Sequence, residues 1–107
     1  MKEYVKVAVD AMGGDYAPVE PVKGAVDAVN ANEEIFVYLV GQKAVIEAEL
    51  AKYTYPRERI SIVEASEVIE TGEPPVNAIR GKKDSSMVVA LNMVRRQEAD
   101  AIVSSGS

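Results

Sequence analysis

The segment Asp10-Ala-Met-Gly13-Gly14-Asp15 brings two carboxylates and two adjacent glycines together directly after an apolar run. Glycine allows a positive φ and leaves neighbouring backbone N–H groups unshielded, which suits the approach of an anion or a closely packed ligand. The spacing is not the GxGxxG of a dinucleotide site, and no acidic residue follows the second predicted strand. An ordinary strand-to-helix turn capped by Asp15 is the alternative. Both interpretations fit this segment taken alone.

A second polar segment reads GKKDSS at residues 81–86. Lys82 and Lys83 stand just before a predicted helix, and Ser85 and Ser86 bring hydroxyl groups to its first turn. The positive end of a helix dipole, together with cations, hydroxyl donors and free amides, favours the binding of phosphate. The alternative is an ordinary capped helix beside solvated lysines. We favour anion binding, because a long irregular connection leads into this segment.

The third candidate follows the last predicted strand and reads SSGS at residues 104–107. Small hydroxyl residues and a glycine after a central strand resemble a phosphate-binding turn, here with Ser104, Gly106 and Ser107. A frayed chain terminus is the alternative explanation for the same residues.

The composition limits the classes of function. Hydrophobic residues make up 48% and charged residues 27% of the 107 residues, as in a globular protein that is not disordered. The formal charge of −5 argues against nucleic-acid binding. Because cysteine and histidine are both absent, thiolate nucleophiles, the usual catalytic triads and most transition-metal sites are excluded within this stretch. We therefore expect no metal and no cofactor. No apolar run approaches the roughly 20 residues of a membrane span, and no signal peptide precedes the first strand, so we expect a cytoplasmic protein.

Apolar periodicity then predicts the elements that position these segments. Strands are predicted at residues 4–9, 35–41, 59–63 and 101–103. Helices are predicted to begin near Pro18, to span residues 42–53, and to follow a cap at Asp84 or Ser85. Strand–helix alternation predicts an α/β fold with a mainly parallel sheet and helices on both faces, within one segment of residues 1–107. Because ligands gather outside the carboxyl ends of parallel strands, the three polar segments are expected at one edge.

Apolar stripes predict which helical residues are buried. The first helix has such a stripe at Val19, Val22, Ala25, Val26 and Val29, the second at Val45, Ile46, Ala48 and Leu50, and the third at Met87, Val88, Leu91 and Val94. One helical turn is predicted at residues 76–80 within the long connection. The remaining charges are predicted to be solvated: Glu47, Glu49, Lys52, Arg57 to Arg59, Arg95 and Arg96.

Three stretches together identify a family. VAVDAMGGDYAP, EPPVNAIRGKKDSSMVVAL and ADAIVSSGS occur in this order and span most of the chain. They resemble the N-terminal third of the PlsX-type phosphate acyltransferases of bacterial phospholipid synthesis. The family's turn after the fourth strand usually reads SAGNTG, whereas Ser105 here replaces the alanine and Ser107 the asparagine.

This resemblance implies a three-layer α/β/α fold, similar to phosphotransacetylases and the isocitrate dehydrogenase group, of which this chain holds a truncated part. It also implies transfer of a fatty acyl group from acyl carrier protein to inorganic phosphate, with acyl phosphate as product. The implied enzyme is a homodimer that associates peripherally with the membrane.

Inorganic phosphate can itself attack a thioester carbonyl, so this reaction needs no cysteine, serine or histidine in the protein. The protein has to hold the anion and stabilise the developing oxyanion. We expect Lys83 and Ser85 to be catalytic. Asp10 and Asp15 either orient hydrogen-bond donors or repel a misplaced anion. The residues expected to bind phosphate or the substrate are Asp10, Gly13, Gly14, Asp15, Lys82, Ser86, Ser104, Gly106 and Ser107.

Two other functions compete with this one. A phosphotransacetylase-like enzyme would use a coenzyme A thioester as acyl donor. A receiver-type signalling domain would also have an aspartate at the end of its first strand, as Asp10 is here. Such a domain needs a phosphoacceptor aspartate at the end of the third strand, where this chain has Val63 and Glu64.

Overall fold

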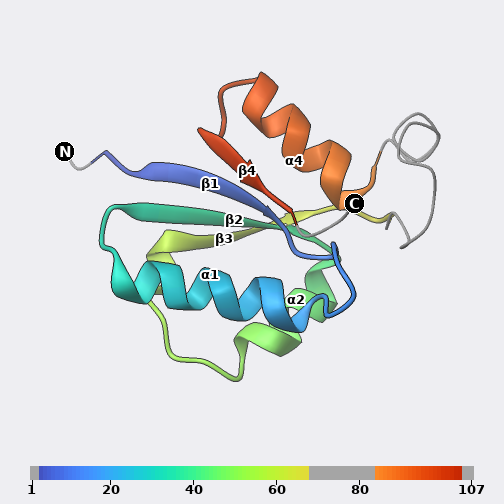
Figure 1. Ribbon diagram of the computed structural model, residues 1–107. Helices are drawn as coiled ribbons and strands as arrows, with labels where there is room; N and C mark the ends of the chain where they lie inside the picture. Colours follow the sequence, from blue (N-terminus) through green and yellow to red (C-terminus); the bar gives the residue numbers. More distant parts are fainter. Residues whose placement is uncertain (1–2, 68–83, 105–107) are drawn as a thin grey trace.

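The computed structural model describes residues 3–67 and 84–104. Its strands form one parallel sheet in the order β3-β2-β1-β4 (Figure 1). Their bounds are β1 (Val5–Asp10), β2 (Ile35–Gly41), β3 (Ile60–Glu64) and β4 (Ala101–Val103). The helices are α1 (Val19–Ala31), α2 (Lys43–Leu50) and α4 (Ser86–Arg95), and a short 3₁₀ turn, η1 (Arg57–Arg59), precedes β3. Each predicted strand is confirmed to within one residue. The helical turn predicted at residues 76–80 lies outside the described residues.

Helices cover both faces of the sheet (Figure 1). On one face α1 and α2 pack against β1 and β2, around Val22, Val29, Leu39 and Ile46, which are all fully buried. On the other face α4 packs over Ala8 and Val40. The predicted α/β fold with a parallel sheet is therefore confirmed. None of the helices within residues 3–67 and 84–104 has the length and apolar character that crossing a bilayer requires.

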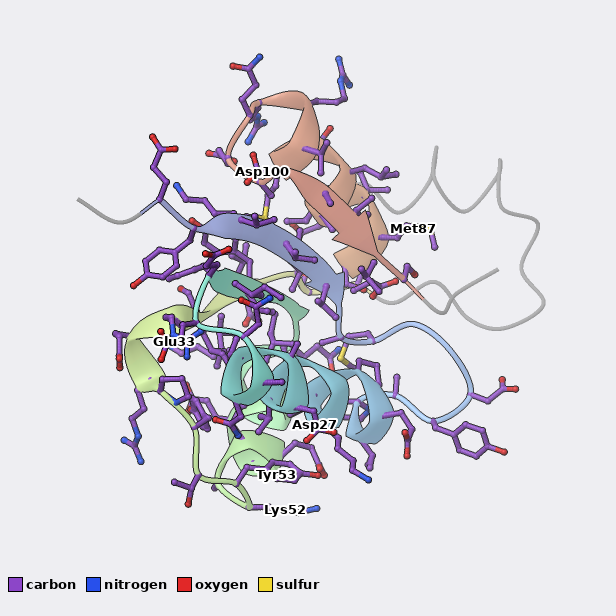
Figure 2. All side chains as sticks on the ribbon, turned by 60° about the vertical axis from the view of Figure 1, so that its left-hand side comes forward. Asp27, Glu33, Lys52, Tyr53, Met87 and Asp100 are labelled. Carbon is purple, nitrogen blue, oxygen red and sulfur yellow. The ribbon has the colours of Figure 1, made fainter. Side chains whose placement is uncertain are left out.

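The strand order places a topological switch beside β1. The chain first moves outward from β1 to β2 and β3, and then returns to place β4 on the other side of β1. Asp100, labelled in Figure 2, fixes this pairing, because its carboxylate accepts from the Lys6 amide at 2.8 Å and its own amide donates to the Lys6 carbonyl at 2.7 Å. In such sheets ligands bind in the crevice where the strand order reverses.

This strand order excludes the receiver-type alternative. Receiver domains have the order 2-1-3-4-5, in which the third strand lies beside the first. Here β3 lies at the edge beside β2. Glu64, at the end of β3, acts as a helix cap, because its Oε2 accepts from the Lys43 amide at the start of α2 at 2.7 Å.

The third predicted helix presents a different face from the one expected. The residues of α4 that are buried are Ser86, Ala90 and Met93, whereas Leu91 is 38% exposed. The predicted stripe of Met87, Val88, Leu91 and Val94 did not include the residues that are buried in the structure. In the structure Ser86 faces the sheet and donates to Asp10, and this contact sets the rotation of the helix.

Two smaller differences concern the other helices. The second helix ends at Leu50 and not at Tyr53, since the amides of Lys52 and Tyr53 bond three residues back in a tighter turn. Ala48 was expected in the core and is exposed, as is Val19 at 43%.

Arg59 was expected on a solvated surface, and this prediction is wrong. Its side chain is 9% exposed and lies against the end of α1. The guanidinium donates to the carbonyls of Val29 at 2.7 Å, Asn32 at 2.7 Å and Ile35 at 3.2 Å. The last carbonyls of a helix lack partners within the helix and carry partial negative charge. A buried arginine supplies both the hydrogen-bond donors and a compensating positive charge.

Candidate functional site

The carboxylate of Asp10 is the centre of the candidate site. It lies at the end of β1 and is 3% exposed. Its Oδ1 accepts from the Met12 amide at 3.1 Å and from the Ser86 hydroxyl, and its Oδ2 accepts from the Ser104 hydroxyl at 2.8 Å. One side chain therefore joins the end of β1, the first turn of α4 and the residue after β4. Figure 1 shows β1 and β4 side by side. We call Asp10, Ser86 and Ser104 the carboxylate–hydroxyl cluster.

Gly13 is required by this cluster. A Cβ at Gly13 would lie 2.6 Å from Oδ2 of Asp10 and 3.0 Å from the Ser104 hydroxyl oxygen. The space beside this glycine was interpreted as room for a ligand, and in the structure it is occupied by the Asp10 carboxylate. Gly14 has a φ of 90°, a backbone conformation that residues other than glycine rarely adopt.

Asp15 lies three residues before Pro18, the N-cap residue of α1. It is exposed, and α1 begins after Pro18 without a side-chain cap. The N-cap position of α1 is thus not Asp15, and the alternative of a turn capped by Asp15 stays a prediction. Of the residues predicted in the first segment, Asp10 and Gly13 join the cluster, while Asp15 lies on the exposed part of the loop.

The start of α4 is held by protein contacts. Ser85 is its cap, with a hydroxyl oxygen that accepts from the Val88 amide at 3.3 Å, so the choice between Asp84 and Ser85 falls on Ser85. Ser85 is fully buried and Ser86 is 2% exposed. The Ser86 amide donates to the Glu67 carbonyl at 3.2 Å, and its hydroxyl donates to Asp10. Both donor groups of Ser86 are thus already committed within the protein.

Asp84 ties the start of α4 to the segment after β3. Its Oδ2 accepts from the Ser66 hydroxyl at 2.5 Å and from the Ser66 amide at 2.9 Å. These hydrogen bonds, the one from the hydroxyl above all, lower the pKa of the Asp84 carboxyl below its usual value. Ser66, a serine just after a predicted strand, was the sequence signal for this contact.

In the described part of the site, hydrogen-bond donors surround the Asp10 carboxylate. Within residues 3–67 and 84–104, no ion pair involves Asp10, and no group of acidic residues could hold a metal ion. Lys82, Lys83, Gly106 and Ser107, which were predicted to contribute to this site, lie outside the described residues. The described residues form a fixed carboxylate that aligns two hydroxyl groups at the carboxyl edge of a parallel sheet.

Comparison with known proteins places the chain in a family. The family described as "Fatty acid synthesis protein" matches residues 5–107. Proteins named "Phosphate acyltransferase" are similar to it: that of Clostridium beijerinckii is 50% identical over 103 residues, which are 96% of this chain and 31% of the relative. The one of Alkaliphilus oremlandii is 52% identical, over 96% of this chain and 30% of the relative.

A third relative, from Syntrophomonas wolfei, also named "Phosphate acyltransferase", is 53% identical over 96% of this chain and 32% of its own length. The chain thus spans about a third of the length of these curated relatives. The family match extends from the first residue of β1 through the carboxylate–hydroxyl cluster to the last residue. The chain therefore belongs to the fatty acid synthesis protein family.

Proposed function

We propose that this chain is the N-terminal segment of a phosphate acyltransferase, which transfers an acyl group from a thioester to inorganic phosphate. The names of its relatives support this reaction class. The observation that carries the proposal is the convergence of Asp10, Ser86 and Ser104 at the switch point of the sheet. Parallel sheets of this order bind their ligands at this point.

The reaction balances without a protein nucleophile. An oxygen of hydrogen phosphate attacks the thioester carbonyl carbon, and a C–O bond forms as the C–S bond breaks. The thiolate leaves and takes up the proton of the phosphate, so the products are an acyl phosphate and a thiol. The protein lowers the barrier by holding the two reactants together and by stabilising the negative charge on the carbonyl oxygen.

In this reaction Asp10 is a positioning residue. Its two oxygens accept from the hydroxyls of Ser86 and Ser104, which supports the role of orienting groups over that of repelling a misplaced anion. A buried carboxylate would repel phosphate at close range. The anion therefore binds outside the cluster, at the amides near Gly13 and Gly14 and at Lys82 and Lys83.

We propose that the acyl donor is acyl carrier protein loaded with a fatty acyl chain, and that the pathway is bacterial phospholipid synthesis. The intact enzyme is then a cytoplasmic homodimer that associates peripherally with the membrane. These proposals rest on the family resemblance of the three sequence stretches described above. A coenzyme A thioester is the competing donor.

The reaction is tested with the full-length protein that carries this chain. It is incubated with acyl-acyl carrier protein or acyl-coenzyme A, with and without phosphate, and acyl phosphate is trapped by hydroxylamine. Phosphate-dependent product from the carrier-protein thioester is expected. Product from the coenzyme A thioester alone would assign the competing donor, and the absence of phosphate-dependent product from either would refute the reaction.

Variants of the same protein test the residues. Lys83→Ala and Ser85→Ala are expected to remove most activity, whereas Lys43→Ala, an exposed lysine on α2, serves as the matched control. An unchanged dependence on phosphate concentration in the first two variants would remove those residues from the site. Asp10→Asn keeps the size of the side chain but lacks one of the two acceptor oxygens, so it is expected to raise the KM for phosphate and lower kcat.

A further inference from the structure

A second contact, besides the carboxylate–hydroxyl cluster, holds the loop that follows β1. Met12, two residues after the strand, is buried, and its side chain lies against Gly41, the last residue of β2. A Cβ at Gly41 would lie 2.7 Å from Cγ and 3.0 Å from Sδ of Met12. A glycine in a strand often marks such a close approach. The absence of a side chain at Gly41 therefore leaves the space that the Met12 side chain occupies.

The backbone of Gly41 is fixed by the sheet. Gly41 pairs with Glu64 of β3, and its carbonyl accepts from the Ala65 amide at 2.9 Å. The position of the added Cβ also lies 3.2 Å from Cδ1 of Ile46, which is fully buried in the core between the sheet and the helices α1 and α2. Met12 thus anchors the loop to a rigid part of the molecule.

The backbone amides of this loop differ in their partners. The amides of residues 11–13 donate within the protein, to the Val40 carbonyl at 2.9 Å, to Oδ1 of Asp10 at 3.1 Å and to the Asp10 carbonyl at 3.4 Å. Gly14 follows with a φ of 90°, and its amide has no acceptor within residues 3–67 and 84–104. Amides that point out of a turn in this way are suited to bind an anion. Among the amides of residues 11–14, that of Gly14 is therefore the candidate for phosphate.

We propose that Met12 is a positioning residue for the phosphate substrate. Its side chain, packed against Gly41, holds residues 11–14 in the conformation that presents the Gly14 amide to the anion. The inference rests on the proposed function and adds to it the residue that fixes this part of the phosphate site. Met12 acts through Gly14 and not by contact with the substrate. A methionine that only filled the core would affect stability and not the binding of phosphate.

Steady-state kinetics of the full-length protein, with inorganic phosphate as the varied substrate, test the inference. Met12→Ala is expected to raise the KM for phosphate about tenfold and to leave kcat nearly unchanged, because one hydrogen bond to a charged group is lost. Met12→Leu conserves the volume and should keep the KM close to that of the original protein. Met93→Ala is the matched control, since it makes the same change at a buried methionine of α4. It is expected to lower the midpoint of thermal unfolding and to leave the KM unchanged.

Gly41→Ala tests the same contact from the side of the sheet. The added Cβ would displace the Met12 side chain, so the KM for phosphate should rise as it does in Met12→Ala. In the double variant, Gly41→Ala should add little to the effect of Met12→Ala, because the two atoms nearest to the added Cβ are gone. Full addition of the two effects would overturn the inference. So would an unchanged KM in folded Met12→Ala, or an equal rise in Met93→Ala.

Isotopic labelling of the glycine nitrogens gives a readout that needs no variant. When the full-length protein is titrated with phosphate, the NMR signal of the Gly14 amide is expected to move, whereas that of Gly24, on α1, is expected to stay. A Gly14 signal that does not move at saturating phosphate would overturn the inference. If phosphate-dependent product still forms, the proposed function stands without it. The absence of such product would refute the proposed function and the inference with it.

Discussion

Replacing Gly13 by alanine is expected to destabilise the protein strongly. The added Cβ would lie 2.6 Å from Oδ2 of Asp10, closer than real Cβ atoms approach an oxygen, so the carboxylate has to move. Overpacking of this kind costs about 1–3 kcal/mol. Moving the carboxylate also weakens its hydrogen bond with Ser104, at about 1 kcal/mol. We therefore expect a loss of about 2–4 kcal/mol in the free energy of unfolding, a large part of the usual 5–15 kcal/mol.

Urea unfolding followed by circular dichroism measures this loss, and thermal unfolding should show a midpoint lower by roughly 10–20 °C. Gly24→Ala is the matched control, because it is the same chemical change at a glycine with nothing within 4 Å. It is expected to stabilise the protein by about 0.5–1 kcal/mol, as alanine does in a helix. The two variants should thus move the midpoint in opposite directions.

A double-mutant cycle with Asp10→Ala isolates the steric contact. Without the carboxylate, the Cβ at position 13 has its nearest neighbour removed. Gly13→Ala should then cost about 1–3 kcal/mol less than it does in the original protein. If Gly13→Ala proves as stable as Gly24→Ala, or costs the same with and without the Asp10 carboxylate, the cluster is not packed as described.

Three further changes test other contacts. Arg59→Met is expected to cost about 2–3 kcal/mol in urea unfolding because it removes the donors to three carbonyls, whereas Arg57→Met, at an exposed position, should change stability by less than about 0.5 kcal/mol. Ser85→Ala is expected to lower the free energy of unfolding by about 1 kcal/mol through loss of the helix cap, and no change would contradict that role. Ser66→Ala is expected to raise the pKa of Asp84 toward its ordinary value of 3.8, measured by NMR titration. Because the pKa of Asp84 is lowered in the folded protein, the contribution of Asp84 to stability is present above the ordinary pKa and is lost as pH falls through the pKa of the folded state. The pH at which stability is lost on the acid side should therefore shift in Ser66→Ala.

The positions of the strands could be predicted because hydrophobic alternation is a local property. The stretch from Ile35 to Gly41 is apolar throughout, as expected for a strand buried on both faces, and it forms β2 with these bounds. Helix faces were harder to predict. In α4 the predicted stripe included Leu91, whereas the buried face contains Ser86 and Ala90, because the small residues let the helix approach the sheet.

The candidate site was predicted in its parts and not in its internal contacts. Asp10 and Ser86 are 76 positions apart, and Asp10 and Ser104 are 94 positions apart. Contacts over such separations cannot be predicted from a local sequence pattern. The glycine pair could be identified in the sequence, but its structural role could not. Only the packed structure shows that Gly13 accommodates the Asp10 carboxylate.

The sequence by itself determined the alternation of strands and helices, the parallel sheet that this alternation requires, and the family to which the chain belongs. These follow from residue types that act over short distances along the chain. Tertiary structure alone decided that β4 returns beside β1, that Arg59 is buried against α1, and that one carboxylate aligns two distant serines. The reason is that strand order and helix rotation depend on which surfaces pack together, and this is a property of the whole fold.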